Sequence, residues 1–323
     1  MNQRPDTYTF QRYLSSKRTV DDRALNRHVW ESLHTELARR SSPSRPLTIL
    51  EIGGGIGTMV ERLLEEDRLP ATIYHLLDEQ PENIATANAR LRPRFGSANP
   101  QAPTSSPFQL PPTHQHLLQT PTGTRHELSL YTSDLFDFLA LAGSLANVDL
   151  LLAHAFMDLV DIPSTLPKFT ATLRPGSLLY FTINFDGATI LEPTIDAAFD
   201  AHVEQVYHRT MDERITNGER SGDSHTGRHL FHQMKTANIQ TLDAGSSDWV
   251  IIPSSHRGGY PHDEGYFLHF IVNTMYGALR NHPDLDTARF RNWIVTRHAQ
   301  IEQGELIYIA HQLDYLGEYL GNP

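Results

Sequence analysis

The sequence contains no cysteine among its 323 residues. This absence excludes disulfide bonds, cysteine-ligated zinc, iron–sulfur clusters and a thiol nucleophile. Long hydrophobic runs are also missing, because the most apolar stretch, residues 149–157, is far shorter than the roughly 20 residues of a membrane-spanning helix. The first residues lack the basic-then-apolar order of a signal peptide. We therefore expect a cytoplasmic protein that does not associate with a membrane.

Basic charge is scarce as well. The chain has 27 lysine and arginine residues against 38 acidic residues, a formal net charge of -11. A broad nucleic-acid-binding surface is not expected from this balance, although a local basic cleft is compatible with it. The hydrophobic content of 39% and the charged content of 20% are typical of a folded domain with a core. These values favour a small-molecule partner and no nucleic acid.

Short apolar segments alternate with helix-like segments in the first two thirds of the chain. The pattern predicts strands at residues 47–52, 72–77, 128–131, 148–153 and 177–183. Helical periodicity separates several of these strands, at residues 57–66, 81–91 and 163–173. Continuous apolar strands separated by helices indicate a parallel sheet covered on both faces. The predicted fold class is therefore α/β, a doubly wound Rossmann-like sheet.

Further elements follow in the last third of the chain. Strands are predicted at residues 249–252 and 306–310, and helices at residues 263–280 and 285–303. The aromatic residues of these two helices are suited either to the core or to a dimer surface, so we expect a monomer or a homodimer.

Three segments depart from the alternation. Residues 1–45 are helical, with one apolar stripe, and form either a packed helix or a lid over a cleft of the main domain, residues 46–323. Residues 92–126 are rich in Pro, Gln, Ser, Thr and His without periodicity, so a flexible insertion is predicted there. Residues 186–236 are polar and rich in His and Arg, and we expect an acceptor-binding insertion.

The strongest motif is the glycine cluster at residues 50–57, Leu-Glu-Ile-Gly-Gly-Gly-Ile-Gly. Glycines after a strand allow a tight turn and a close approach to a ligand, while the next helix offers free N–H groups. A dinucleotide fingerprint needs a third glycine where Thr58 stands, which counts against NAD. Asp78 ends the second strand, where an acid can accept the ribose hydroxyls of NAD or of an adenosyl ligand.

Together with Asp134–Leu135 and residues 148–160 and 173–176, these motifs resemble those of class I S-adenosylmethionine-dependent methyltransferases. The resemblance implies a seven-stranded sheet whose last strand is antiparallel, and S-adenosyl-L-methionine as the cofactor. It covers residues 45–185 closely and residues 245–315 loosely. With the N-terminal segment as lid, the expected cofactor-binding residues are Tyr13, Arg18, Glu51, Gly53, Gly55, Gly57, Asp78, Glu79, Asp134, Leu135 and His154.

The resemblance does not assign the methyl acceptor. In this family the substrate region comes from N-terminal helices and from insertions after the fourth and fifth strands. Arginines there could bind a carboxylate or phosphate, and a histidine or tyrosine could act as a general base, although a solvated surface segment would have the same composition. The substrate-binding candidates are Asp158, Arg209 and Arg228, and the catalytic candidates are His154, Tyr207, His208, His225 and His229.

Methyl transfer from a sulfonium is an in-line displacement that requires alignment and exclusion of water, and no metal. Three other functions stay open: a nicotinamide oxidoreductase, a non-catalytic S-adenosylmethionine-binding protein, and a methyltransferase that acts on RNA or protein. Residues 153–156 read Ala-His-Ala-Phe where the family's Asn/Asp-Pro-Pro-Tyr type of motif would stand. Its absence and the negative net charge favour a small-molecule acceptor.

Overall fold

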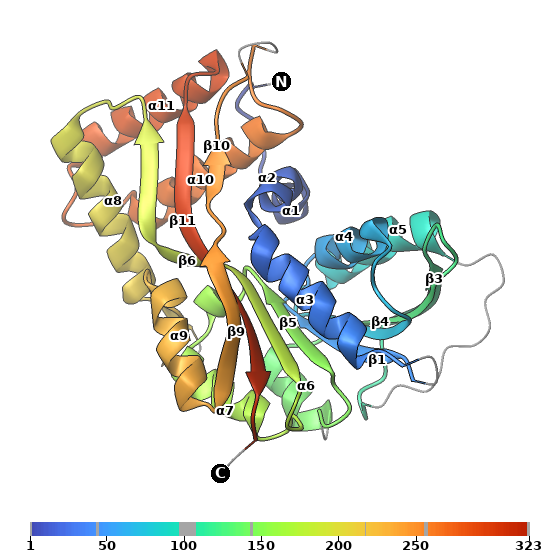
Figure 1. The fold of residues 1–323 in the computed structure, drawn as a ribbon. Helices are drawn as coiled ribbons and strands as arrows, with labels where there is room; N and C mark the ends of the chain where they lie inside the picture. The colour runs from blue at the N-terminus through green and yellow to red at the C-terminus, as the bar shows by residue number, and fades with distance from the viewer. Residues whose placement is uncertain are drawn as a thin grey trace.

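The computed structural model describes residues 2–42, 45–96, 108–142, 145–216, 218–254 and 258–321. Within them, one nine-stranded sheet has the order β10-β11-β6-β5-β1-β2-β4-β3, and β9 also pairs with β11 (Figure 1). The parallel strands are β1 (Leu47–Ile52), β2 (Thr72–Asp78), β4 (Arg125–Thr132), β5 (Leu150–His154) and β6 (Leu178–Glu192). The antiparallel strands are β3 (His114–Gln119), β9 (Ile239–Ser246), β10 (Trp249–Ile251) and β11 (Ile307–Tyr319). The predicted doubly wound α/β fold is confirmed.

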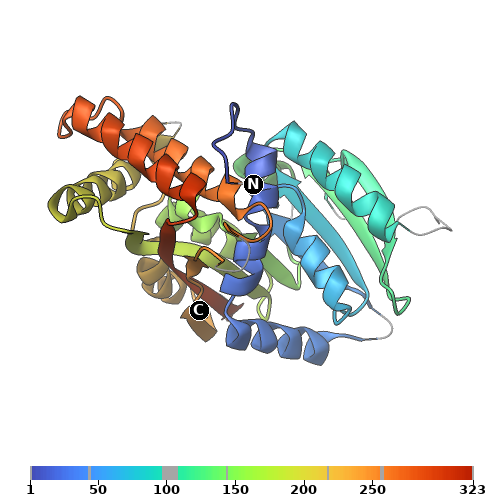
Figure 2. The ribbon, with the colours of Figure 1, turned by 90° about the horizontal axis from the view of Figure 1, so that it is seen from above.

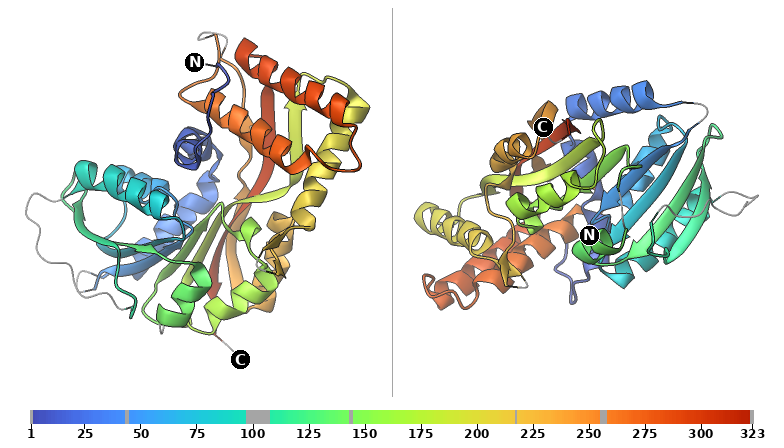
Figure 3. Two further views of the ribbon diagram at one scale, coloured as in Figure 1. Left: turned by 180° about the vertical axis from the view of Figure 1, so that it is seen from behind. Right: turned by 90° about the horizontal axis from the view of Figure 1, so that it is seen from below.

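Helices cover both faces of the sheet, so two hydrophobic cores form. Strand β1 shows the division, because Leu47 and Ile49 contribute to one core and Leu50 and Ile52 to the other. The first core lies under α3 (Arg27–Arg40), α4 (Thr58–Glu66), α5 (Pro81–Phe95), α8 (Ala197–Asp212), α10 (Glu264–Leu279) and α11 (Thr287–Gln303). The second lies under α6 (Leu135–Ala142), α7 (Ile162–Thr170) and α9 (Thr226–Thr236), which Figure 3 shows from behind.

The antiparallel end of the sheet is longer than predicted. Strand β6 continues past residue 183, where the prediction ended, and β11 pairs with it from Ile307 to Glu318 through two register shifts. Strands β9 and β10 together occupy the position of the predicted sixth strand, one on each part of β11. The apolar run at residues 177–183 marked the fully buried part of β6, because most of the residues beyond it are only partly buried or exposed. In β11, the buried polar residues Gln312 and Asp314 interrupt the apolar pattern.

Half of the described residues of the predicted flexible insertion, residues 92–126, lie in a helix or a strand instead. Helix α5 continues to Phe95, and β3 pairs antiparallel with β4 at the edge of the sheet. Residues 97–107 of this segment lie outside the described part of the chain. Strand β3 escaped prediction because five of its six residues are only partly buried or exposed, so its sequence lacks an apolar run.

The N-terminal segment comprises three helices where the sequence pattern suggested one continuous stripe. Helix α1 (Phe10–Ser16) is followed by α2 (Arg18–Ala24), whose C-cap is Leu25. Asn26 then caps α3 by accepting hydrogen bonds from the N–H groups of His28 and Val29. Helix α3 packs against β9 and β11. Helices α1 and α2 instead lie between the α4–α5 pair and the α10–α11 pair (Figure 2). Only these two helices are therefore placed to form a lid.

The two predicted C-terminal helices are confirmed as α10 and α11. Phe267 and Trp293 are buried in the first core, so these aromatic residues serve the core of the fold. Among the described residues, no helix combines the length and the apolar character needed to cross a membrane.

One buried histidine makes the fold sensitive to acid. His75 on β2 is fully buried, its ring packs edge-on against Phe108, and its Nε2 atom is buried without a hydrogen bond. Burial lowers the pKa of His75 to about 4. Below pH 6.5 the unfolded chain binds a proton that the folded chain excludes until about pH 4, so stability decreases as the pH falls through this window.

We therefore expect His75→Phe to reduce the loss of stability in acid. Between pH 7 and pH 5 the wild type should lose about 2 kcal/mol more of its unfolding free energy than the variant. Urea unfolding at both pH values measures the difference. His232→Gln, at an exposed ring on α9, is the matched control and should not change the pH dependence. Equal pH dependence in His75→Phe and the wild type would contradict the role of His75.

Candidate functional site

A cavity of about 560 Å³ lies at the carboxyl ends of the parallel strands. Its walls come from the glycine loop after β1, the end of β2, the residues that follow β4 and β5, helix α1 with Lys17 after it, and the hairpin of β7 (Ile215–Thr216) and β8 (Glu219–Arg220). Ligands of open α/β sheets bind at this edge, where the strand order reverses around β1 and β5.

The glycine loop forms one wall of the cavity. Gly53 and Gly55 both have positive φ angles, +61° and +54°. A Cβ atom on Gly53 would lie 2.2 Å from Cδ2 of Phe156, so no other residue fits at this position. Gly57 also has a positive φ, but a Cβ atom there would face Leu91 of α5. Gly53 and Gly55 therefore line the cavity, while Gly57 forms the turn into α4 behind it.

Asp78 connects the end of β2 to the glycine loop. Its Oδ2 atom accepts a hydrogen bond from the N–H of Gly55 at 2.8 Å. Its Oδ1 atom accepts from the N–H of Gln80 at 2.9 Å and from Nδ2 of Asn83 at 3.0 Å. Burial raises the pKa of Asp78. A carboxylate offers about four acceptor positions, so one is left for a ligand hydroxyl in the cavity that Asp78 lines.

Two further acids line the same half of the cavity. Oε2 of Glu51 accepts a hydrogen bond from the Tyr74 hydroxyl at 2.8 Å, and burial raises the pKa of Glu51 to about 8. Glu51 is therefore largely protonated at neutral pH until a cationic group approaches it. Oδ1 of Asp134 accepts hydrogen bonds from the N–H groups of Phe136 and Asp137 at the start of α6. Leu135 and Phe136 add an apolar surface beside it.

His154 links the end of β5 to the lid. Its Nδ1 atom lies 2.7 Å from Oγ1 of Thr182, and its Nε2 atom lies 3.1 Å from Oδ2 of Asp21 on α2. Burial lowers the pKa of His154 to about 4, so the ring is neutral. Because both ring nitrogens are occupied, an acceptor's proton could reach the ring only after one of these contacts opened. The geometry favours a positioning role for His154 over that of a general base.

The lid contributes different residues from those predicted. Phe10, Leu14 and Lys17 line the cavity, at a spacing that places them on one helical face. Tyr13 points away and stacks on aromatic rings of α10. Arg18 forms ion pairs with two glutamates of α4. The structure therefore does not bring Tyr13 and Arg18 into the candidate cofactor site. Their residue types are suited to ligand binding, but the orientation of the helix determines which side chains reach the cavity.

The other acceptor-side candidates also lie outside the cavity wall. Arg209 pairs with Asp284 at the surface, and Arg228 pairs with Asp186. The substrate-binding role predicted for these two arginines is therefore not supported by their positions. The remaining candidates that do not line the cavity are Asp158, Tyr207, His208, His225 and His229.

The three histidines among these remaining candidates have polar partners of their own, whereas Oδ1 of Asp158 is buried without a hydrogen bond. Tyr207 is partly buried, and this burial raises its pKa to about 12. His208 contacts the Thr189 hydroxyl, and His229 contacts the Asp223 carboxylate. His225 accompanies Asp212 and Asp223 at metal-ligand spacing, but exposed acidic groups often have this arrangement without a metal. None of these contacts directs a side chain to the cavity.

Sequence reasoning missed the acceptor-side wall. Phe156, Leu159 and Val160 follow β5, and Arg214 and Arg220 come from the β7–β8 hairpin. The first three lie within the segment that resembled a family motif, so their apolar character could have been noted. The hairpin gave no signal, because two-residue strands have no periodicity.

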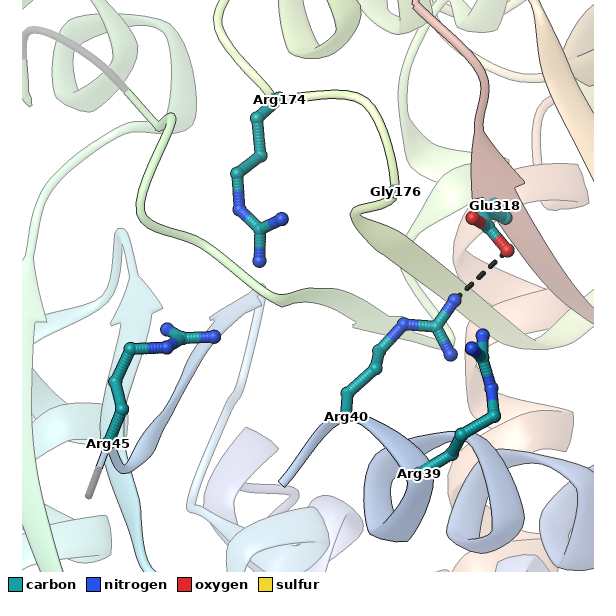
Figure 4. Close-up of a pocket in the computed structure, with 6 residues that line it drawn as sticks. All are labelled: Arg39, Arg40, Arg45, Arg174, Gly176 and Glu318. Atoms are coloured by element: carbon teal, nitrogen blue, oxygen red, sulfur yellow. Dashed lines mark hydrogen bonds and ion pairs between the residues drawn. The ribbon is translucent and has the colours of Figure 1, made fainter. Parts of the chain in front are cut away.

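A second hollow lies at the opposite end of the strands. Arg39, Arg40, Arg45 and Arg174 surround it together with Glu318 (Figure 4). Each of the four guanidinium groups has a carboxylate partner: Arg45 and Arg174 bind Asp149, and Arg39 and Arg40 bind Glu36, with Arg40 also reaching Glu318. The positive charge of this hollow is therefore largely compensated within the fold.

The strand order β4-β2-β1-β5-β6 followed by antiparallel β11, with the glycine loop after β1 and an acid at the end of β2, defines the Rossmann-like methyltransferase fold. This is the fold that the sequence motifs implied, here with an added edge strand β3 and a divided sixth strand.

Three solved structures to which the chain is similar are described as methyltransferases. A candidate methyltransferase from Bacillus halodurans C-125 is 10% identical, with 89% of this chain and 99% of that chain covered and a TM-score of 0.46. A candidate methyltransferase in complex with the Haloferax volcanii Trm112 activator is 16% identical, with 98% and 99% covered and a TM-score of 0.45. Geranyl diphosphate C-methyltransferase from Streptomyces coelicolor A3(2) is 11% identical, with 90% and 77% covered and a TM-score of 0.39. No family model matches the chain, and no curated protein matches it. The fold is therefore defined by the strand order itself.

Proposed function

We propose that the protein is an S-adenosylmethionine-dependent methyltransferase that transfers a methyl group to a small molecule. One observation supports this most strongly: a single cavity joins the glycine loop, Asp78 and Asp134 with a second region walled by the lid and the β7–β8 hairpin. The first region suits an adenosyl ligand and the second leaves space for an acceptor. A volume of about 560 Å³ lies within the range of roughly 300–1,000 Å³ of small-molecule sites.

The residues present fit this cofactor. Gly53 and Gly55 hold the loop in a left-handed backbone conformation at the cavity wall, and Asp78 retains an acceptor position for a ribose hydroxyl. Asp134 would accept a hydrogen bond from the adenine amino group, with Leu135 beside the ring. A methionyl ammonium near Glu51 would favour the ionised carboxylate. When bound, the sulfonium supplies an already activated methyl group.

The chain itself supplies alignment and exclusion of water. Phe10 and Leu14 of α1 close the cavity opposite the glycine loop, and a Cβ atom on Gly55 would lie 3.1 Å from Cδ1 of Leu14. The Asp21–His154 contact fixes the lid on the end of β5. Holding two reactants in line lowers the barrier of a displacement without a metal or a covalent intermediate.

A non-catalytic S-adenosylmethionine-binding protein is the second candidate. The occupied ring nitrogens of His154 favour it, because a hydroxyl or ammonium acceptor needs a base. An acceptor atom that is already nucleophilic needs none, so this observation limits the choice of acceptor more than it excludes catalysis.

Calorimetric titration with S-adenosylmethionine, S-adenosylhomocysteine and NAD tests the cofactor. We expect binding of both adenosyl compounds and none of NAD. Transfer of a radiolabelled methyl group to the small-molecule fraction of a cell extract then tests turnover, with the protein and RNA fractions assayed in parallel. Binding without labelling of any fraction would favour the non-catalytic candidate, and labelling of a macromolecular fraction alone would contradict the small-molecule acceptor.

A further inference from the structure

Acidic and basic residues line different parts of the cavity. The acidic residues Glu51, Asp78, Glu79 and Asp134 line the cofactor half. The acceptor half contains the basic residues Lys17, Arg214 and Arg220 and one acidic residue, Asp161. Asp161 is already engaged, because its carboxylate caps α7 through the N–H of Ser164. Lys17 is also engaged, because its Nζ atom lies 3.2 Å from Oδ2 of Asp21. Two arginines are left for a ligand.

Arg214 is held in place by the backbone. Its Nε atom donates to the carbonyl of Ser221 at 3.1 Å, and its Nη2 atom donates to the carbonyl of Asp158 at 2.6 Å. Among the residues that the structure describes, no carboxylate lies within ion-pair distance of it. The Asp158 carboxyl interacts with the Arg214 charge without forming an ion pair, and burial raises the pKa of that carboxyl.

Arg220 has neither a hydrogen bond nor an ion pair from its side chain to any described residue. It pairs with Ile215 across the hairpin, so it lies one register position from Arg214 on the adjoining strand. Both arginines line the same cavity. The arginines of the hollow in Figure 4 differ, because carboxylates of the fold already bind all four of them.

We infer that the acceptor carries an anionic group, a carboxylate or a phosphate, that Arg220 and Arg214 bind. The inference rests on the proposed function, and it specifies the class of acceptor. A guanidinium group matches the planar pair of oxygens of a carboxylate or phosphate with two parallel hydrogen bonds. Phe156, Leu159 and Val160 provide an apolar surface for the rest of the molecule. The acceptor is therefore an acidic compound with an apolar body.

The test uses simple probes on the protein saturated with S-adenosylhomocysteine. Benzoate and phenyl phosphate represent the two anionic groups, and benzamide is the neutral counterpart of benzoate. We expect at least one anion to bind about tenfold or more tightly than benzamide, the size of effect of a charge-assisted hydrogen bond. The comparison of benzoate with phenyl phosphate tells which anion the arginines prefer.

Arg220→Gln is the decisive variant, because Arg220 does not hold the fold together, whereas Arg214 fixes the hairpin to the segment after β5. It should bind the preferred anion about tenfold more weakly and S-adenosylhomocysteine unchanged. Arg39→Gln, in the second hollow, is the matched control and should change neither affinity.

Two failures are distinguishable. If S-adenosylhomocysteine binds but the anions bind no better than benzamide, or if Arg220→Gln leaves anion affinity intact, the anionic acceptor is wrong and the methyltransferase proposal stands. If S-adenosylhomocysteine does not bind at all, the proposed function fails, and the inference that rests on it fails with it.

Discussion

Replacing Asp78 with alanine should weaken the binding of S-adenosylhomocysteine by about a hundredfold or more. A hydrogen bond to a charged group contributes roughly 1.5–3 kcal/mol, and 2.7 kcal/mol corresponds to a hundredfold change in affinity. The change also releases the N–H groups of Gly55 and Gln80, which Asp78 now holds. The variant therefore loses both the ligand contact and the fixed shape of the glycine loop.

Calorimetric titration measures this effect, and two further variants separate its causes. Asp78→Asn keeps an acceptor oxygen for Gly55 but removes the charge, so its affinity should lie between those of the wild type and Asp78→Ala. Glu82→Ala, at an exposed acid in the first turn of α5, is the control and should bind normally. Unchanged affinity in Asp78→Ala would show that the cofactor binds elsewhere.

The cofactor half of the cavity could be predicted from the sequence because its residues have fixed positions relative to strands. Glu51 and the glycines follow a buried apolar run, and Asp78 ends the next one. In a parallel sheet the carboxyl ends of neighbouring strands meet at one edge, so local patterns determine a shared site. The same reasoning placed His154 at the end of β5, where the structure confirms its position beside the cavity.

The lid could be predicted only as an element. The helical pattern identified the segment, but the side of α1 that faces the cavity depends on contacts with α10, which no local pattern contains. Tyr13 was chosen for its chemistry, yet its ring lies 4.1 Å from that of Phe270, in a stack that belongs to the core. Phe10 and Leu14, which do line the cavity, look like ordinary core residues in the sequence.

The acceptor half was the least predictable region. The polar segment at residues 186–236 contains helices α8 and α9, and four of its described residues line the cavity: Arg214, Thr216, Arg220 and Ser221. Arg209 and Arg228 occur in the same composition but form ion pairs on other surfaces. The composition of the segment shows that it contains arginines. Only the fold shows which of them have a carboxylate partner, and the arginines without one are those that can bind a ligand.

Asp21→Ala should have the largest effect on stability, a loss of about 3–5 kcal/mol in unfolding free energy. The Asp21 carboxylate is fully buried between Lys17, His154 and the indole Nε1 of Trp249, at 3.2, 3.1 and 2.8 Å. Burial alone would raise the pKa of Asp21, but the Lys17 charge and the His154 hydrogen bond hold it below its usual value. Without Asp21, the Lys17 ammonium would be buried with no ion-pair partner.

Urea unfolding measures this loss, and Asp263→Ala is the matched control. Asp263 pairs with Arg12 at 3.0 Å, but both side chains are about half exposed, so the loss should stay below about 1 kcal/mol. Adding Lys17→Met to Asp21→Ala removes the unpaired charge and should restore part of the stability. If Asp21→Ala unfolds no more easily than Asp263→Ala, the buried cluster does not fix the lid. The lid would then owe its position to its other contacts, among them the aromatic stacking of α1 on α10 and the ion pairs of Arg18 with α4.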